Sequence, residues 1–263
     1  MCGIVAYIGH RQACPILIKG LKRLEYRGYD SAGLAIYGES LQVYKKKGKV
    51  AALESILPEG GVPGHVGIAH TRWATHGEPS DVNAHPQLSN DGSLAMVHNG
   101  IIENYITLKQ ELELLGHRFV SETDTEVFLH LIEEIKNQNH CLLEEAVAQA
   151  IKRVIGTYVI VVLDQANPDQ LIAARKGSPL VIGIGKHEHF LASDASPIVE
   201  YTQDAVYVND YEIAILTADQ LILKNSENEH STPFIEKLDM DLASIEKGGY
   251  EHFMLKEIHE QPI

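Results

Sequence analysis

The sequence predicts an α+β fold built on antiparallel sheets, and three observations lead to this class. Short apolar runs typical of strands fill both ends of the chain, while the middle carries the wider spacing of amphipathic helices. No stretch alternates strand and helix in the way that βαβ units do. At 263 residues and 44% hydrophobic, the chain can bury a substantial core, and one large domain is the simplest organisation.

The charge and the cysteine content exclude several classes of partner. Lys and Arg total 22 against 36 Asp and Glu, so the formal charge of −14 opposes binding to nucleic acid or to an anionic membrane. Cys2, Cys14 and Cys141 form no close pair, which indicates neither a disulfide framework nor a cysteine zinc site and favours a reducing cytoplasm. No apolar run approaches the roughly 20 residues of a membrane span, and the start lacks the regions of a signal peptide. We therefore expect a soluble cytoplasmic protein.

The first third of the chain predicts strands around one helix. Gly3–Ile8 is an apolar run of strand length closed by Gly9. Leucines at helical spacing behind Pro15 predict a helix that stops near Gly28, inside the polar segment 24–33, which is typical of a solvated turn. Further elements expected here are a strand at 34–37, an exposed or edge strand at 42–47, a short helix at 50–57 and a strand at 66–70.

The cysteine at position 2 is the first candidate catalytic residue. Removal of Met1 would make Cys2 the N-terminus and place a free α-amine on the carbon that carries the thiol. An α-amine has an ordinary pKa of about 7.7 to 8, compared with about 10.4 for lysine, so it can accept a proton near pH 7. A thiol is already a good nucleophile, and an adjacent base activates it further. The alternative is that Cys2 is a small apolar residue at the start of a buried strand.

The segment 70–80, HTRWATHGEPS, predicts a pocket for a small polar ligand. Arg72 presents a fork of donors that matches a carboxylate, and Thr75, His76 and backbone amides can complete the pocket. The long polar loop that follows has few apolar anchors, which is typical of a mobile lid. The alternative is a surface loop in which Trp73 caps the core.

The strand predicted at 94–98 ends at the pair Asn99-Gly100. Such a pair is commonest in tight turns, and this is the simpler interpretation. The chemical alternative is an oxyanion hole, formed when a strand-end asparagine amide and a glycine N–H point the same way. Each donor of this kind is worth about 3 to 4 kcal/mol of the barrier in acyl transfer.

Three helices are expected in the middle of the chain, at 108–115, 127–135 and 143–154. The second is preceded by a capping-box pattern, Thr123 with Glu126. Asp124 then falls in the first turn, where an acid complements the helix dipole. The same carboxylate could receive the ammonium group of a substrate.

The rest of the chain predicts short strands between Gly, Pro and Asp turns. They lie at 158–163, 171–174, 180–184, 190–192, 205–208, 212–216 and 221–223. The segment 183–186 is too short a match to a phosphate-binding loop to predict a nucleotide, and we expect no cofactor. The final segment, 250–263, carries no polar finish, so we expect the natural chain to continue beyond it.

Fourteen histidines raise the alternative of a metal site. Four that follow one another in sequence, His70, His76, His85 and His98, are separated by six, nine and thirteen residues. These spacings match neither HExxH nor the close pairs of zinc fingers. The sequence therefore predicts no metal site.

Four separated motifs, read together, resemble the N-terminal glutaminase domain of the glucosamine-6-phosphate synthase family of class II glutamine amidotransferases. The motifs are CGIV at 2–5, LEYRGYDSAG at 24–33, HTRWATHG at 70–77 and the pair Asn99-Gly100. The segment 121–126 and the tail also fit, so the resemblance covers essentially the whole chain.

The resemblance implies an N-terminal-nucleophile hydrolase fold, a four-layer αββα sandwich of two antiparallel sheets. It implies that Cys2 is the nucleophile, with its own α-amine as the base, and that Asn99 and Gly100 form the oxyanion hole. Arg72 would hold the α-carboxylate of glutamine and Asp124 its α-ammonium. Further substrate contacts are expected from Thr75, His76, Gly100, His85 and the Trp73 loop, while Arg27 and Gly28 should line the neighbourhood of the nucleophile.

The resemblance also implies a reaction and a larger enzyme. The chain would hydrolyse the side-chain amide of L-glutamine through a cysteine thioester and supply the ammonia for conversion of fructose 6-phosphate to glucosamine 6-phosphate. Residues 1–240 would form the glutaminase domain, and 241–263 would lead towards a C-terminal sugar-isomerase domain that this chain lacks. A homodimer is compatible with this interpretation.

Two alternatives of different kinds remain open at the level of sequence. Glutamine phosphoribosyl-pyrophosphate amidotransferase and asparagine synthetase resemble this chain at residues 2–4 and at the Asn-Gly pair, although 26–30 and the Trp73 run fit the aminosugar enzyme better. A non-catalytic module that senses glutamine or binds a metal would use the same scaffold without turnover.

Overall fold

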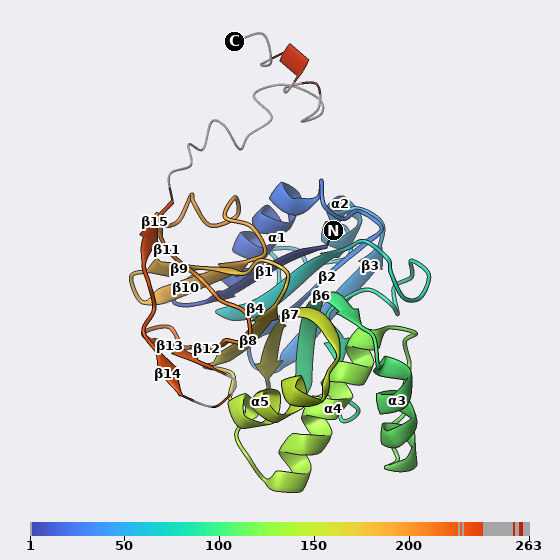
Figure 1. Ribbon diagram of the computed structural model, residues 1–263. Coiled ribbons are helices and arrows are strands. Elements are labelled where there is room, and N and C mark those ends of the chain that lie inside the picture. Colours follow the sequence, from blue (N-terminus) through green and yellow to red (C-terminus); the bar gives the residue numbers. More distant parts are fainter. Residues whose placement is uncertain (1, 226, 228, 239–254, 256–257, 260–263) are drawn as a thin grey trace.

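The polypeptide folds into two stacked antiparallel sheets that lie between two layers of helices (Figure 1). The computed structural model describes residues 2–225, 227, 229–238, 255 and 258–259. The predicted C-terminal segment 241–263 lies almost entirely outside the described residues. The predicted αββα sandwich is confirmed.

The first sheet has eight strands in the order β15-β11-β9-β10-β1-β4-β2-β3. Its strands are β1 (Gly3–Ile8), β2 (Ser31–Tyr37), β3 (Leu41–Lys47), β4 (Val66–Arg72), β9 (Val181–Gly185), β10 (Glu188–Ala192), β11 (Asp204–Tyr207) and β15 (Glu236–Lys237). The predicted edge position of residues 42–47 is confirmed, because β3 ends the sheet. β1 lies inside the sheet, between β10 and β4, so the residue that precedes it is anchored by paired strands on both sides.

The second sheet has seven strands in the order β14-β13-β12-β8-β7-β6-β5. Its strands are β5 (Gln87–Leu88), β6 (Leu94–Ile102), β7 (Gly156–Asp164), β8 (Leu171–Lys176), β12 (Ile213–Leu216), β13 (Leu221–Lys224) and β14 (His230–Ser231). All neighbouring strands in this sheet pair antiparallel, as the sequence predicts.

The helices divide between the two outer layers. α1 (Ala13–Leu24) and α2 (Val50–Glu54) cover the first sheet, while α3 (Tyr105–Leu114), α4 (Asp124–Asn139) and α5 (Leu143–Arg153) cover the second (Figure 1). The five helices that the sequence predicts are all present. Among the described residues, none of the helices has the length and apolar character needed to cross a membrane.

Three apolar clusters fill the spaces between the four layers. The alternation of side chains along β1 shows how one strand serves two of them. Ile4 and Ile8 enter the cluster between the sheets, whereas Val5 and Tyr7 enter the cluster beneath α1. A strand buried on both faces reads as a continuous apolar run, which is why Gly3–Ile8 is recognisable in the sequence.

The interpretation of Asn99-Gly100 as a tight turn is wrong. β6 continues through both residues to Ile102, because β7 pairs with it along its whole length, with Asn99 opposite Val159 and Gly100 opposite Tyr158. Gly100 has φ +140°, and a Cβ atom there would lie 2.0 Å from the carbonyl oxygen of Thr157. Only glycine permits this approach of the two strands.

The capping box before α4 forms in a modified way. The Thr123 hydroxyl accepts the N–H of Glu126 at 3.3 Å, as predicted. The Glu126 carboxylate does not return to Thr123; it accepts the N–H groups of Val120 and Ser121 at 2.8 and 2.7 Å. The carboxylate therefore fixes the loop that leads into α4, and Asp124 is held at the first turn as expected.

Candidate active site

Cys2 lies where the first sheet meets the loop that follows β4. The N–H of Trp73 donates to Cys2 Sγ at 3.2 Å, and the thiol lies 3.5 Å from the carbonyl oxygen of the same residue. Burial raises the pKa of the Cys2 thiol above its ordinary value, and the Trp73 N–H opposes this rise. The thiol is therefore positioned by backbone, and a base is needed to remove its proton at neutral pH.

A cavity of about 300 Å³ opens beside this thiol. Its wall includes six of the predicted site residues: Cys2, Arg27, Trp73, Thr75, Asn99 and Gly100. Asn99 and Gly100 lie on β6 of the second sheet, Cys2 immediately precedes β1 of the first sheet, and the other three lie in loops, so the cavity lies at the junction of the two sheets. Its volume is at the lower end of the range for small-molecule sites, which suits a ligand the size of an amino acid.

The side-chain amide of Asn99 is held at both ends. Its Nδ2 donates to the carbonyl oxygen of Cys2 at 3.1 Å, and its Oδ1 lies 2.9 Å from Nε2 of His70. Burial lowers the pKa of His70 to about 3, so the ring is neutral near pH 7. A neutral His70 that donates from Nε2 to Oδ1 fixes which end of the Asn99 amide faces Cys2.

Arg72 stands at the end of β4 and is buried. Its Nη2 donates to the carbonyl oxygens of His76 and Gly77, the latter at 3.1 Å, so it holds the following loop in a curve. Its Nη1 is also buried and has no hydrogen-bond partner within the described part of the chain. A buried donor of this kind marks a place where an acceptor from outside the chain would be stabilised.

Asp124 and His76 face each other next to this arginine. Asp124 Oδ2 accepts the N–H of Ile102 at 2.8 Å, and Oδ1 lies 3.9 Å from Nδ1 of His76. The bond to Ile102 ties the first turn of α4 to the strand that carries Asn99 and Gly100. Thr75 is exposed and lines the cavity beside Cys2.

Five of the predicted residues are not in the cavity wall, namely Gly28, Arg72, His76, His85 and Asp124, and two of these five lie behind other site residues. His85 is buried, and its ring packs at a tilt against that of His70 with centroids 4.3 Å apart. Gly28 lies against the backbone of Arg72, where a Cβ atom would approach the carbonyl carbon to 2.9 Å. His85 therefore supports His70, which in turn holds Asn99, and Gly28 makes room for the backbone of Arg72.

Arg27 also lines the cavity, and it is held in place by contacts with the loop after β10. Its guanidinium pairs with Asp194 at 2.6 Å and donates to the Ser193 carbonyl oxygen at 3.2 Å. The ring of Trp73 is half exposed and packs edge-on against Tyr29, with centroids 5.7 Å apart.

Several cavity residues escaped the sequence analysis, namely Ile101, Thr157, Ser178, Pro179 and Ser193. Ser193 shows why. Its hydroxyl accepts the N–H of Ile4 at 3.0 Å, because the register of β1 on β10 places it opposite that residue. Ser193 and Ile4 are 189 positions apart, so no local sequence motif predicts this hydrogen bond.

The arrangement is suited to acyl transfer at an amide or ester. A thiol, an amide donor and a glycine N–H border one cavity, while a buried arginine and a buried carboxylate lie beside it. An amino acid with a side-chain carbonyl would present complementary groups to each of them.

The comparisons with known proteins agree with this chemistry. A family model described as "Glutamine amidotransferase domain" matches residues 70–200. The whole chain is 57% identical to a "Glutamine--fructose-6-phosphate aminotransferase [isomerizing]" of Bacteroides thetaiotaomicron and 55% identical to the protein of the same name from Chlorobaculum tepidum. In each case it covers 43% of the relative, so the chain spans less than half the length of these relatives.

A solved structure shows the same architecture. The glutamine phosphoribosylpyrophosphate amidotransferase from B. subtilis superposes with a TM-score of 0.75 at 28% identity, over 87% of this chain and 50% of that one. The similarity in fold therefore extends over most of this chain.

Proposed function

The chain belongs to the glutamine amidotransferase domain family, and on that premise we propose that it hydrolyses the side-chain amide of L-glutamine at Cys2. The observation that carries the proposal is the cavity at the junction of the sheets, in which the thiol of Cys2, Asn99 and Gly100 meet. The products are glutamate and ammonia.

The first half of the reaction forms a thioester. After loss of Met1, the α-amine of Cys2 takes the proton of the thiol, and Sγ attacks the side-chain carbonyl carbon of glutamine. The carbonyl oxygen becomes an oxyanion that Asn99 Nδ2 and the Gly100 N–H stabilise. When the C–N bond breaks, the protonated amine returns its proton to the departing nitrogen, which leaves as ammonia.

The second half restores the enzyme. The α-amine accepts a proton from a water molecule, whose oxygen attacks the carbonyl carbon of the γ-glutamyl thioester. The carbonyl oxygen again becomes an oxyanion, bound by Asn99 and Gly100 as before. The C–S bond then breaks, and the amine returns the proton to the thiolate. The terminal amine is used twice, which is why the state of Met1 decides activity.

The amino-acid end of glutamine is bound, in this proposal, by the charged pair beside the cavity. The free Nη1 of Arg72 takes the α-carboxylate, and Asp124 takes the α-ammonium through Oδ1, the oxygen that does not accept from Ile102. Thr75 and His76 add polar contacts. Trp73 and its loop close over the substrate, and Trp73 limits the escape of ammonia. His85 and its neighbours 83–87 are buried behind His70, so this segment supports the site and does not cover it.

The acceptor of the ammonia is proposed from the relatives. Their name supports fructose 6-phosphate as acceptor, and their greater length supports a C-terminal sugar-isomerase domain as partner. Residues 1–240 as the glutaminase domain stay a prediction from the sequence. Transfer to phosphoribosyl pyrophosphate is the alternative that the solved neighbour represents. The cytoplasmic location and a homodimer stay predictions from the sequence.

The decisive experiment compares the parent chain with Cys2→Ala. With Met1 removed, the parent is expected to release glutamate from L-glutamine, and Cys2→Ala is expected to bind glutamine without turnover. Glutamate release by Cys2→Ala at the parental rate would contradict the proposal. Glutamine binding by a parent that shows no turnover would instead favour a sensing module.

A further inference from the structure

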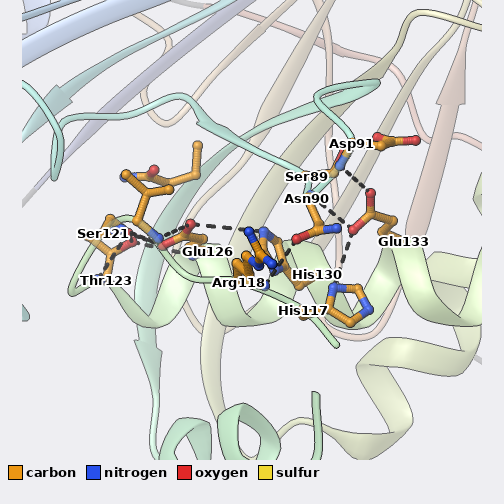
Figure 2. A network of polar contacts seen from close by, with 12 residues as sticks. Ser89, Asn90, Asp91, His117, Arg118, Ser121, Thr123, Glu126, His130 and Glu133 are labelled. Atoms are coloured by element: carbon orange, nitrogen blue, oxygen red, sulfur yellow. Dashed lines mark hydrogen bonds and ion pairs between the residues drawn. The ribbon is translucent and has the colours of Figure 1, made fainter. Parts of the chain in front are cut away.

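A second cluster of buried polar side chains lies far from Cys2 in the chain, where the loop after α3 packs on α4 (Figure 2). It contains His117 from the loop, and His130 with Glu133 from one face of the helix. His130 and Glu133 are three positions apart, which places both side chains on the same side of α4. All three residues are buried.

The two imidazoles have unused nitrogen atoms. Nδ1 of His117 and Nδ1 of His130 are both buried and have no hydrogen-bond partner within the described part of the chain. His130 is 1% exposed, and its ring lies 5.2 Å from that of His117 between centroids. Buried nitrogen atoms without partners are destabilising unless something else occupies them.

The distances suit a small cation. One potential ligand atom from each residue lies within 4.8 Å of the other two. Nδ1 of His117 is 3.4 Å from Oε2 of Glu133. Two ligands at about 2.05 Å from a tetrahedral zinc ion are separated by about 3.3 to 3.4 Å, so this pair already has the required spacing.

Glu133 is held for such a role by the neighbouring turn. Its two oxygens accept the N–H groups of Asn90 and Asp91 at 2.9 and 3.0 Å, which fixes the orientation of the carboxylate. Nε2 of His117 pairs with Glu134 at 2.8 Å, the arrangement by which a carboxylate orients a ligating imidazole from its far side. The remaining lone pairs of Glu133 stay available to a metal.

A route from solvent is also present. His130 and Glu126 line a cavity of about 670 Å³ between the edges of the two sheets and α4, together with Lys45, Asp91 and Arg118. Of the three residues, His130 lines this cavity, so the cavity leads from solvent to one edge of the cluster.

We propose that His117, His130 and Glu133 form a binding site for a divalent transition metal, with zinc as the preferred ion. Two imidazoles and one carboxylate form a ligand set that suits zinc and leaves one position for water. The ion would join the loop after α3 and the Asn90–Asp91 turn to α4, and its role is to brace them. No sequence motif marks this site, because His117 and His130 are 13 residues apart, which matches neither HExxH nor the close pairs of zinc fingers.

The test is calorimetric titration of the metal-free chain with Zn²⁺, and separately with Mg²⁺, in a buffer that does not coordinate metals. A Cys2→Ala background removes the thiol of the first cavity as a competing ligand. One zinc ion is expected to bind per chain, with Mg²⁺ binding at least a hundredfold more weakly. His130→Gln and Glu133→Gln are each expected to weaken zinc binding at least tenfold, whereas the exposed-residue control His10→Gln is expected to change nothing.

A second measurement needs no variant in the cluster. Zinc X-ray absorption of the loaded Cys2→Ala chain is expected to show nitrogen and oxygen neighbours only, with the multiple scattering of two imidazoles. Saturable binding of equal affinity in the parent, His130→Gln and His10→Gln would overturn the proposal. An absorption spectrum with sulfur neighbours, or no saturable binding at all, would overturn it as well.

Discussion

The two ends of the proposed glutamine site are built in different ways. The end that performs the chemistry is satisfied internally, since Asn99 is bonded at both atoms of its amide and Cys2 is bonded to the backbone of Trp73. The end that recognises the amino acid has spare capacity. Nη1 of Arg72 and Nδ1 of His76 are buried and without hydrogen-bond partners among the described residues.

The difference shows how a site divides rigidity and recognition. Groups that must meet a developing charge are fixed by paired strands, so no reorganisation is needed during the reaction. Groups that bind a charged substrate keep buried donors without partners. Substrate binding gives these donors hydrogen bonds, and the cost of leaving them unbonded is removed. Substitutions at the chemistry end should therefore act on kcat, and substitutions at the recognition end on KM.

The largest effect is expected from blocking the terminal amine. Insertion of one leucine between Met1 and Cys2 keeps the thiol but moves the α-amine away from it. Because general acid–base catalysis contributes about 10²–10⁴-fold, glutamate release should fall by that factor or more. The rate is measured alongside the intact mass of the same sample. Parental activity in the inserted variant would place the base elsewhere.

Asn99→Ala removes one oxyanion donor at the chemistry end. We expect kcat to fall about 10²–10³-fold with little change in KM, since the donor acts mainly on the transition state. Steady-state glutamate release measures both constants. The exposed Asn139→Ala serves as the matched control and should leave both unchanged. A rise in KM with unchanged kcat in Asn99→Ala would show that Asn99 acts on binding, which contradicts its assignment to the end that performs the chemistry.

Arg72→Lys tests the recognition end. A lysine keeps the charge but loses the fork of donors, so KM for glutamine should rise about 10–100-fold while kcat changes little. Arg153→Lys, at a half-exposed side chain on α5, is the control. Loss of kcat with an unchanged KM would show that Arg72 acts on the reaction and not on binding.

The smallest effect concerns the support of Asn99 by His70. The pKa of His70 is lowered to about 3 in the fold, against about 6.5 when unfolded, so the unfolded chain binds an extra proton between these values. This group therefore makes the free energy of unfolding decrease as the pH falls from 6.5 towards 3, by up to about 1.4 kcal/mol per pH unit. In His70→Gln, urea unfolding at several pH values should show a shallower slope. An unchanged slope would contradict a neutral His70.

Much of the fold was predictable because many of its strands and helices have local sequence patterns. Gly3–Ile8 is buried on both faces and reads as an apolar run, and Thr123 with Glu126 marks the start of α4. Asn99-Gly100 has the local pattern of a tight turn, but pairing with the distant strand β7 continues β6 through both residues. Pairing of this kind has no local signal.

The site was predictable only where it shares motifs with known domains. The residues that complete it from a distance, such as His70 behind Asn99 and Ser193 beside Ile4, act through the stacking and register of strands. Their roles emerge when burial and hydrogen-bond partners are known, because isolated histidines and serines are compatible with many environments.

The most direct measurement of the central claim is intact-mass spectrometry of the chain quenched with acid during turnover of L-glutamine. We expect a species that lacks Met1 and carries one γ-glutamyl group, located on Cys2 by peptide mapping and absent from Cys2→Ser. Turnover without any acylated species under single-turnover conditions, or a γ-glutamyl group on a residue other than Cys2, would contradict the account.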